Sequence, residues 1–182
     1  MDIREIPHSE LVKHIAYVFQ DSFLFNDTIE NNIRMGNENA SFDEVKAAAE
    51  AANIAQMIEA LPNGYQTVIS DSTGLSDGEK QRISIARAIL SDAPIVFLDE
   101  ATASLDPENE VLIQQAIDEL VKNKTVLVIA HRLHSVMNAD DIIVLDNGSI
   151  IEEGTHSELI AKGGKYAALW KNQQSAGSWK IA

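Results

Sequence analysis

Short apolar runs separated by longer stretches of helical spacing constrain the fold of this chain most strongly. The runs are apolar on both faces and cover 15–18, 95–98, 125–130 and 142–145. Strands of this kind are typical of parallel sheets that are covered on both faces. Helical patterns lie between several of the runs, which favours βαβ connections. The sequence therefore predicts an α/β fold with a mostly parallel sheet, in which all of these runs are buried parallel strands.

Capping sequences mark the expected helix starts. Ser41–Glu44 and Ser76–Glu79 each place a serine three residues before a glutamate, which is the spacing of a capping box, and apolar residues follow at helical intervals. Asp106 precedes Pro107, so that a capping carboxylate stands before a first-turn proline. We expect that helix to extend to about Asn123.

The C-terminal part combines a hairpin with helices. Asp146-Asn147-Gly148 predicts a tight turn between the strands 142–145 and 149–152. A helical stretch from 157 to about 174 is expected to break at Gly163-Gly164, and 175–182 is expected to be a flexible tail.

The predicted elements also suggest a division into domains. The stretch 26–90 contains no strong buried strand and reads as a helical subdomain inserted between the first two strands. The remaining core is expected to consist of 1–25 and 91–174.

Charge and composition exclude several classes of function. The formal net charge is −14, which argues against broad nucleic-acid binding, because that requires a surface of Lys and Arg. The chain has no cysteine and therefore no disulfide framework or zinc–thiolate cluster. The apolar runs are too short to span a bilayer, so a membrane crossing would have to come from another segment or chain.

Two adjacent acids, Asp99 and Glu100, follow the apolar run 95–98. Ligands of open parallel sheets bind at the carboxyl ends of the strands. Buried carboxylates are costly unless a cation or a catalytic role offsets the cost. In phosphoryl transfer one acid can hold the magnesium shell and the next can orient the attacking water. Taken alone, the pair fits a solvated acidic loop equally well.

Other polar residues also lie at helix starts or directly after strands, but none of them alone indicates a function. The helix start at Ser76–Glu79 suits an anion, although a well-capped amphipathic helix explains it as well. His131 follows the run 125–130 and is expected at the same sheet edge as Asp99 and Glu100. Gln20 follows the first strand. A lone histidine after a strand is more often structural than catalytic, and a lone glutamine there is uninformative.

The combination and order of these features resemble the ABC-type ATPase domain. The order is Gln20, 75–79, 99–100, 104–106 and His131. The stretches 98–106 and 129–133 are especially specific for this family, and their residue sequences are similar to those of its exporter branch. The resemblance extends from about Asp2 to Trp170. It implies a P-loop NTPase-like fold that is incomplete at its N-terminus, with ATP and Mg²⁺ as cofactors.

The resemblance implies a role for each matching residue. Gln20 matches the Q-loop glutamine, which contacts magnesium and the attacking water and couples to the membrane domain. Asp99 matches the Walker B aspartate and implies magnesium binding. Glu100 implies the general base, and His131 implies contact with the γ-phosphate.

Partners are implied by the same resemblance. The signature segment reaches a nucleotide held by the opposite subunit, and the D-loop communicates across the dimer. The residues that match these two motifs are Ser76, Asp77, Gly78, Glu79, Ser104 and Asp106. The expected partners are a second ABC ATPase domain, identical or different, and the transmembrane domain of an exporter. The domain would then act at the cytoplasmic side of the membrane, and Phe23–Phe25 are expected to face the transporter or, in part, the core.

Two departures of the sequence from the family pattern concern nucleotide binding. The P-loop, Gly-x-x-x-x-Gly-Lys-Ser/Thr, is absent, and only nineteen residues precede Gln20. We therefore expect a fragment that binds ATP poorly and is inactive alone, with exposed apolar strand edges and a tendency to self-associate. Asp77 stands where the family prefers glycine, and its charge is expected to weaken the sandwiching of nucleotide between subunits.

These observations favour the ATP-hydrolysing domain of an ABC exporter, present as a fragment without the P-loop. The alternative is a non-catalytic interaction module, or a degenerate gene fragment, which pairs with a complete ABC domain. A soluble ABC ATPase that acts on DNA is disfavoured by the acidic composition and by the lack of coiled-coil heptads.

Overall fold

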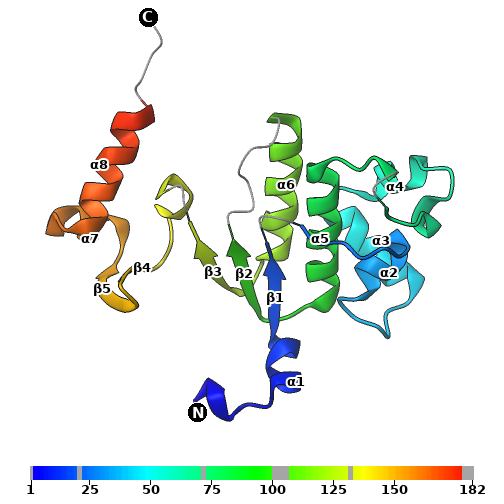
Figure 1. The fold of residues 1–182 in the computed structure, drawn as a ribbon, viewed down its shortest axis with the longest axis horizontal. Coiled ribbons are helices and arrows are strands. Elements are labelled where there is room, and N and C mark those ends of the chain that lie inside the picture. The colour runs from blue at the N-terminus through cyan, green and yellow to red at the C-terminus, as the bar shows by residue number, and fades with distance from the viewer. Residues whose placement is uncertain (1, 20–21, 71–72, 100–106, 131–132, 178–182) are drawn as a thin grey trace, which may run out of the picture. The chain divides into compact units, whose positions relative to one another are not determined.

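The chain forms two compact units, 1–129 and 130–182, in the computed structural model (Figure 1). The structure describes residues 2–19, 22–70, 73–99, 107–130 and 133–177.

The first unit contains most of the helices and the larger sheet. Its elements are a 3-10 helix Ile3–Glu5, α1 His8–Leu11, a 3-10 helix Val12–His14, β1 Ile15–Val18, α2 Ile29–Arg34, α3 Phe42–Ala51, α4 Ala55–Ala60, a 3-10 helix Gly64–Gln66, α5 Asp77–Ser91, β2 Ile95–Asp99, α6 Pro107–Leu120 and β3 Thr125–Ile129. The elements of the second unit are a 3-10 helix Leu133–Val136, β4 Ile142–Asp146, β5 Ser149–Gly154, α7 His156–Lys162 and α8 Lys165–Gly177.

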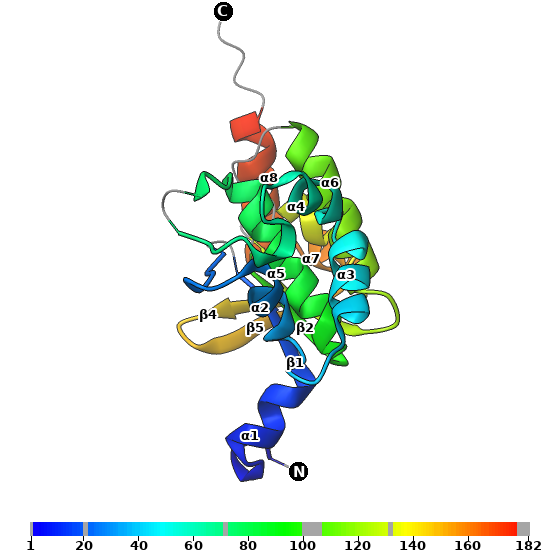
Figure 2. The same ribbon diagram turned by 90° about the vertical axis from the view of Figure 1, so that its right-hand side faces the viewer.

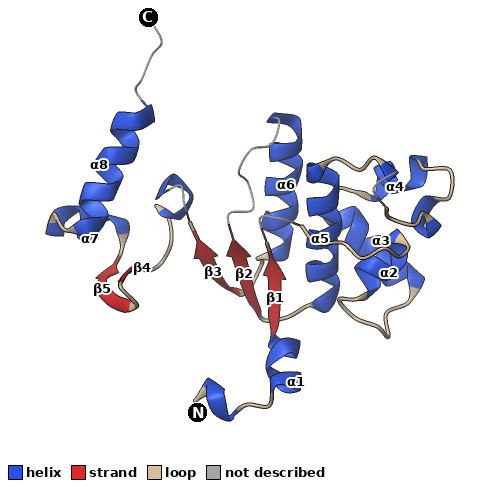
Figure 3. Ribbon diagram, viewed as in Figure 1, coloured by secondary structure: helices blue, strands red, loops and turns tan. Residues whose placement is uncertain are grey.

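A three-stranded parallel sheet with the order β1-β2-β3 confirms the α/β class (Figure 3). Its register places Tyr17 beside Phe97 and Phe97 beside Leu127. The alternate residues Val18 and Val96 are buried in the main core. The helix α5 packs against β1 and α6, so these helices cover the buried side of the sheet.

The strand β3 ends the order of this sheet, and the side chains of Leu127, Val128 and Ile129 are exposed. Exposed apolar residues on an edge strand are a liability for aggregation. The expected self-association of the isolated chain stays a prediction.

Local capping explains where the longer helices begin and end. Ser41 with Glu44 and Ser76 with Glu79 form the predicted capping boxes of α3 and α5. The prediction that the helix from Pro107 extends to about Asn123 is wrong, because α6 ends at Leu120. Asn123 has a φ of 57°, a left-handed conformation that cannot continue a right-handed helix.

The region between β1 and β2 is helical, as the sequence predicted. The helices α2, α3 and α5 pack on one another, and their shared core includes Ile33, Val45 and Ile83 (Figure 2). All of these elements belong to the first unit. The division of the chain into a core and a helical subdomain stays a prediction.

The second unit contains the predicted hairpin. The strands β4 and β5 pair antiparallel, and Asn147 and Gly148 have φ angles of 48° and 77°. Two consecutive positive φ values are typical of a type I′ turn, whose twist matches the strands. The prediction that 142–145 is a buried parallel strand is wrong. Ile142 and Val144 are buried, but Ile143 and Leu145 are exposed, because the core of this unit lies on one face only.

The predicted helical break lies at Gly163, which has a φ of 66° and ends α7. The following helix, α8, extends to Gly177, slightly beyond the expected end. Its Tyr166 packs with Leu159 of α7 in the core of the second unit. In the part of the chain that the structure describes, no helix has the length and hydropathy that a membrane crossing requires.

Candidate functional site

The carboxyl ends of the three parallel strands meet at one edge of the sheet. Asp99 is the last residue of β2 and is partly buried, and its register partner Ile129 is the last residue of β3. Several predicted site residues lie outside the described residues, namely Gln20, Glu100, Ser104, Asp106 and His131. Of these, Gln20, Glu100 and His131 follow β1, β2 and β3 within two residues in the sequence. Their arrangement and their roles stay predictions.

Asp99 is the described residue that suits a magnesium ion. A carboxylate oxygen at this edge is the kind of ligand that Mg²⁺ prefers. Within the described ranges, no group of three or more acidic or histidine side chains could hold a metal. The chemistry of Asp99 therefore fits Mg²⁺ as one ligand, and nucleotide phosphates and water would supply the others.

The signature segment forms the start of α5. Ser76 is the N-cap: its hydroxyl accepts a hydrogen bond from the Glu79 amide at 3.3 Å, and its own amide donates to the Glu79 carboxylate at 2.7 Å. Asp77 is the first helical residue, and its side chain is 91% exposed, at 3.3 Å from the Lys80 ammonium. The structure therefore brings the described signature residues together at an exposed helix N-terminus, where amide dipoles favour an anion.

Gly78 is buried where α5 meets α6. A Cβ atom at this position would lie 2.8 Å from Cγ of Asn109. The Asn109 side chain is held there by Arg82, whose Nη1 donates to its Oδ1 at 2.5 Å. A larger residue at position 78 would therefore force the Asn109 side chain to shift, which favours glycine here independently of any contact with nucleotide.

We expect Gly78→Ala to destabilise the chain by about 1–3 kcal/mol, because the added methyl group overlaps Asn109. Denaturant unfolding measures this effect. The double variant Gly78→Ala/Asn109→Ala should recover part of the loss, since the shorter side chain makes room. If the two single effects simply add, the close contact is not the cause.

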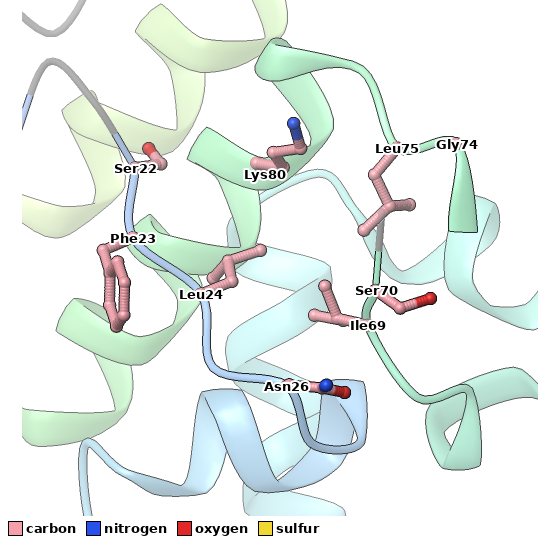
Figure 4. Close-up of a pocket in the computed structure, with 9 residues that line it drawn as sticks. All are labelled: Ser22, Phe23, Leu24, Asn26, Ile69, Ser70, Gly74, Leu75 and Lys80. Atoms are coloured by element: carbon pink, nitrogen blue, oxygen red, sulfur yellow. The ribbon is translucent and has the colours of Figure 1, made fainter. Parts of the chain in front are cut away.

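A groove of about 480 Å³ lies between the segment after β1, the segment before α5 and α5 itself (Figure 4). It is lined by Ser22, Phe23, Leu24, Asn26, Ile69, Ser70, Gly74, Leu75 and Lys80. The floor is partly apolar, since Leu24 and Leu75 both pack against the main core. The lining combines these apolar side chains with polar ones such as Ser70 and Lys80.

An aromatic pair stands beside this groove. The rings of Phe23 and Phe25 meet edge to face at 4.9 Å and are 65% and 45% exposed. Exposed aromatic side chains are enriched at protein-binding surfaces. The expectation that one of Phe23–Phe25 belongs to the core fits Leu24, which packs against the core cluster.

Sequence reasoning missed three polar residues that shape these surfaces: Asn32, Arg87 and Asn109. Asn32 is fully buried in α2 between the buried residues Ile29 and Ile33. An asparagine on the apolar face of a helix is a signal that could have identified it, because a buried amide needs hydrogen-bond partners. Asn109 and Arg87 give no comparable local signal, since their contacts lie on other elements.

Comparisons with known proteins agree on one family. The sequence profile described as ABC transporter matches residues 1–103. The mycobactin import ATP-binding/permease protein IrtA of Mycobacterium tuberculosis is 48% identical over 175 residues, which are 96% of this chain and 20% of that protein. The ATP-dependent lipid A-core flippase of Syntrophus aciditrophicus is 51% identical over 173 residues, covering 94% of this chain and 29% of the flippase.

A solved structure shows the same fold. A bacterial Atm1-family ABC exporter with ATP bound superposes with a TM-score of 0.85 at 40% identity, covering 100% of this chain and 31% of the exporter chain. The chain thus spans about a fifth to a third of the length of these similar proteins. From the matched residues 1–103, which are more than half of the sequence, it follows that the chain belongs to the ABC transporter family.

Proposed function

We propose that the chain supplies the ATP-hydrolysing part of an exporter-type ABC transporter, acting at the cytoplasmic side of a membrane. The observation that carries this proposal is the likeness over the whole chain to an exporter with ATP bound, at 40% identity and a TM-score of 0.85. The position of Asp99 at the carboxyl edge of a parallel sheet supports it, because ligands of such sheets bind there.

The proposed chemistry is hydrolysis of ATP. Asp99 would hold Mg²⁺, which neutralises charge on the phosphates. Glu100 would orient and deprotonate the attacking water, Gln20 would contact the same water and the metal, and His131 would contact the γ-phosphate. The parallel register of β1, β2 and β3 supports a common location, because these residues follow the same ends of the three strands.

The signature segment would act on the nucleotide of a second ABC domain, with Ser104 and Asp106 at the same dimer interface. Ser76 and Asp77 are exposed at the N-terminus of a 15-residue helix, which supports a role toward an external anion. The exposed pair Phe23 and Phe25, together with the groove beside it, would bind the transmembrane domain.

The 182 residues contain no P-loop motif, so a test of ATP hydrolysis needs a chain that supplies this phosphate cradle. A chimera can supply it: the chain replaces the matching 173-residue region of the Syntrophus aciditrophicus flippase. We expect this flippase chimera to hydrolyse ATP and to move the flippase substrate. A chimera that folds and binds ATP without hydrolysing it would contradict the proposal and favour the non-catalytic interaction module.

Replacing Asp77 by glycine in the flippase chimera is expected to strengthen ATP-dependent closure of the dimer and to raise ATP hydrolysis several-fold. The reason is that a carboxylate at this exposed position repels the γ-phosphate of the opposite subunit. Asp77→Asn separates charge from size, since it removes the charge and keeps the side-chain volume. No gain in either variant would show that Asp77 does not weaken nucleotide binding.

A further inference from the structure

Arg87 lies on α5, and its guanidinium donates three hydrogen bonds to two other segments of the chain. Its Nε donates to the backbone oxygen of Asn32 at 2.7 Å, and its Nη2 donates to the side-chain oxygen of Asn32 at 3.1 Å. Its Nη1 donates to the backbone oxygen of Phe23 at 3.2 Å. The guanidinium also lies 5.9 Å from the centre of the Phe25 ring. One side chain thus joins α5 to both α2 and the aromatic pair.

Asn32 extends this connection to the backbone of the same segment. Its side-chain oxygen accepts the Phe25 amide at 2.8 Å, and its amide nitrogen donates to the backbone oxygens of Phe25 and Thr28, each at 3.0 Å. The side-chain amide of Asn32 therefore bonds both the N–H and the C=O of Phe25, as the backbone of a neighbouring strand would do in a sheet. The segment 23–28 is held by hydrogen bonds to α2 and α5.

A buried amide and a half-buried guanidinium contact the segment that carries the two exposed aromatic rings. Asn32 is fully buried, and burial lowers the pKa of Arg87 from its ordinary value, although a guanidinium stays protonated. The rings of Phe23 and Phe25 remain exposed and edge to face. Ordering exposed aromatic side chains before they bind lowers the entropic cost of association.

We propose that Arg87 is a positioning residue of the partner-binding surface, acting through Asn32 and the Phe23 carbonyl to fix Phe23 and Phe25 in their binding orientation. This inference rests on the proposed function, in which that pair binds the transmembrane domain. Arg87 lies on α5, whose N-cap is the signature residue Ser76, so the helix that carries the signature segment also makes the contacts to the aromatic pair.

The geometry needs a planar fork of donors, which lysine does not have. Arg87→Lys keeps the charge and most of the stem but cannot bind Asn32 and Phe23 together. Arg34→Lys is the matched control. Arg34 lies on α2, donates to the Ala40 carbonyl and pairs with Glu30, and these contacts do not involve the segment 23–28.

Hydrogen exchange of the full 182-residue chain tests the positioning without any partner. Arg87→Lys should raise the exchange rate of the segment 23–28 about tenfold, with exchange in α3 unchanged, and Arg34→Lys should leave that segment as in the wild type. If Arg87→Lys does not fold, Asn32→Asp replaces it. That variant keeps the side-chain volume and the acceptor oxygens of Asn32 but loses the N–H that donates to the Phe25 carbonyl. The exchange rate of the segment 23–28 should therefore rise to the same extent. Rates within about twofold of the wild type, or equal effects of the two arginine variants, would overturn the inference.

Transport by the flippase chimera distinguishes a positioning role of Arg87 from a purely structural one, because a purely structural role would not change the ratio of transport to ATP hydrolysis. Arg87→Lys should lower the amount of substrate moved per ATP hydrolysed several-fold while leaving the KM for ATP unchanged. An unchanged ratio would refute the positioning role. Phe23→Ser/Phe25→Ser tests the proposed function separately: normal transport by this variant would show that the pair does not bind the partner, whatever the exchange result for Arg87.

Discussion

The isolated chain is expected to bind Mg²⁺–ATP no more tightly than in the millimolar range. The 182 residues contain no glycine-rich loop with its lysine, and this loop supplies the amides and the cation that hold the β- and γ-phosphates. Asp99 alone adds negative charge at the site. Equilibrium dialysis with labelled ATP, with and without Mg²⁺, measures the affinity directly.

The flippase chimera is the control for this prediction, because it joins the same residues to a P-loop. We expect the chimera to bind ATP at micromolar concentration in the same assay. Micromolar, Mg²⁺-dependent binding by the isolated chain would mean that its phosphate site is made differently from that of the family it belongs to.

Glu100→Gln in the flippase chimera is expected to lower ATP turnover by about 10²–10⁴-fold, the usual contribution of a general base. The amide has the shape of the carboxylate but cannot accept a proton from water. ATP binding should remain, because the residue that we propose as the magnesium ligand is Asp99. Turnover is measured as phosphate release under saturating ATP.

A matched control for this substitution is Glu110→Gln. Glu110 is exposed on α6 and lies ten residues further along the chain. It should leave turnover unchanged. If Glu100→Gln were as active as Glu110→Gln, another group would be the base.

The strands and helix caps could be predicted because they depend on local sequence. Ser76 and Glu79 are three residues apart, and their reciprocal hydrogen bonds need no other part of the chain. The turn at Asn147 and Gly148 is equally local, since both residues tolerate positive φ. The parallel strands β1–β3 followed from apolar runs that are two-sided and separated by helices.

Apart from the end of α6, the errors and omissions concern contacts between distant residues. The run 142–145 is as apolar as the parallel strands, yet Ile143 and Leu145 are exposed because the hairpin is covered on one face. Whether a second layer covers a strand is a property of the fold and not of the run itself. Gly78 shows the same limit: its motif predicted a contact with nucleotide, whereas its approach to Asn109 depends on how α5 and α6 pack.

The central claim is that the signature residues of this chain serve a nucleotide held by another subunit. It is tested by co-expressing two forms of the flippase chimera. One form carries Ser76→Arg, which blocks the signature, and the other carries an alanine in place of the P-loop lysine of the flippase portion. Each form alone should be inactive, and the mixed dimer should recover ATP hydrolysis, because one of its sites combines an intact P-loop with an intact signature from the other subunit. Mixed dimers as inactive as the two separate forms would contradict the account.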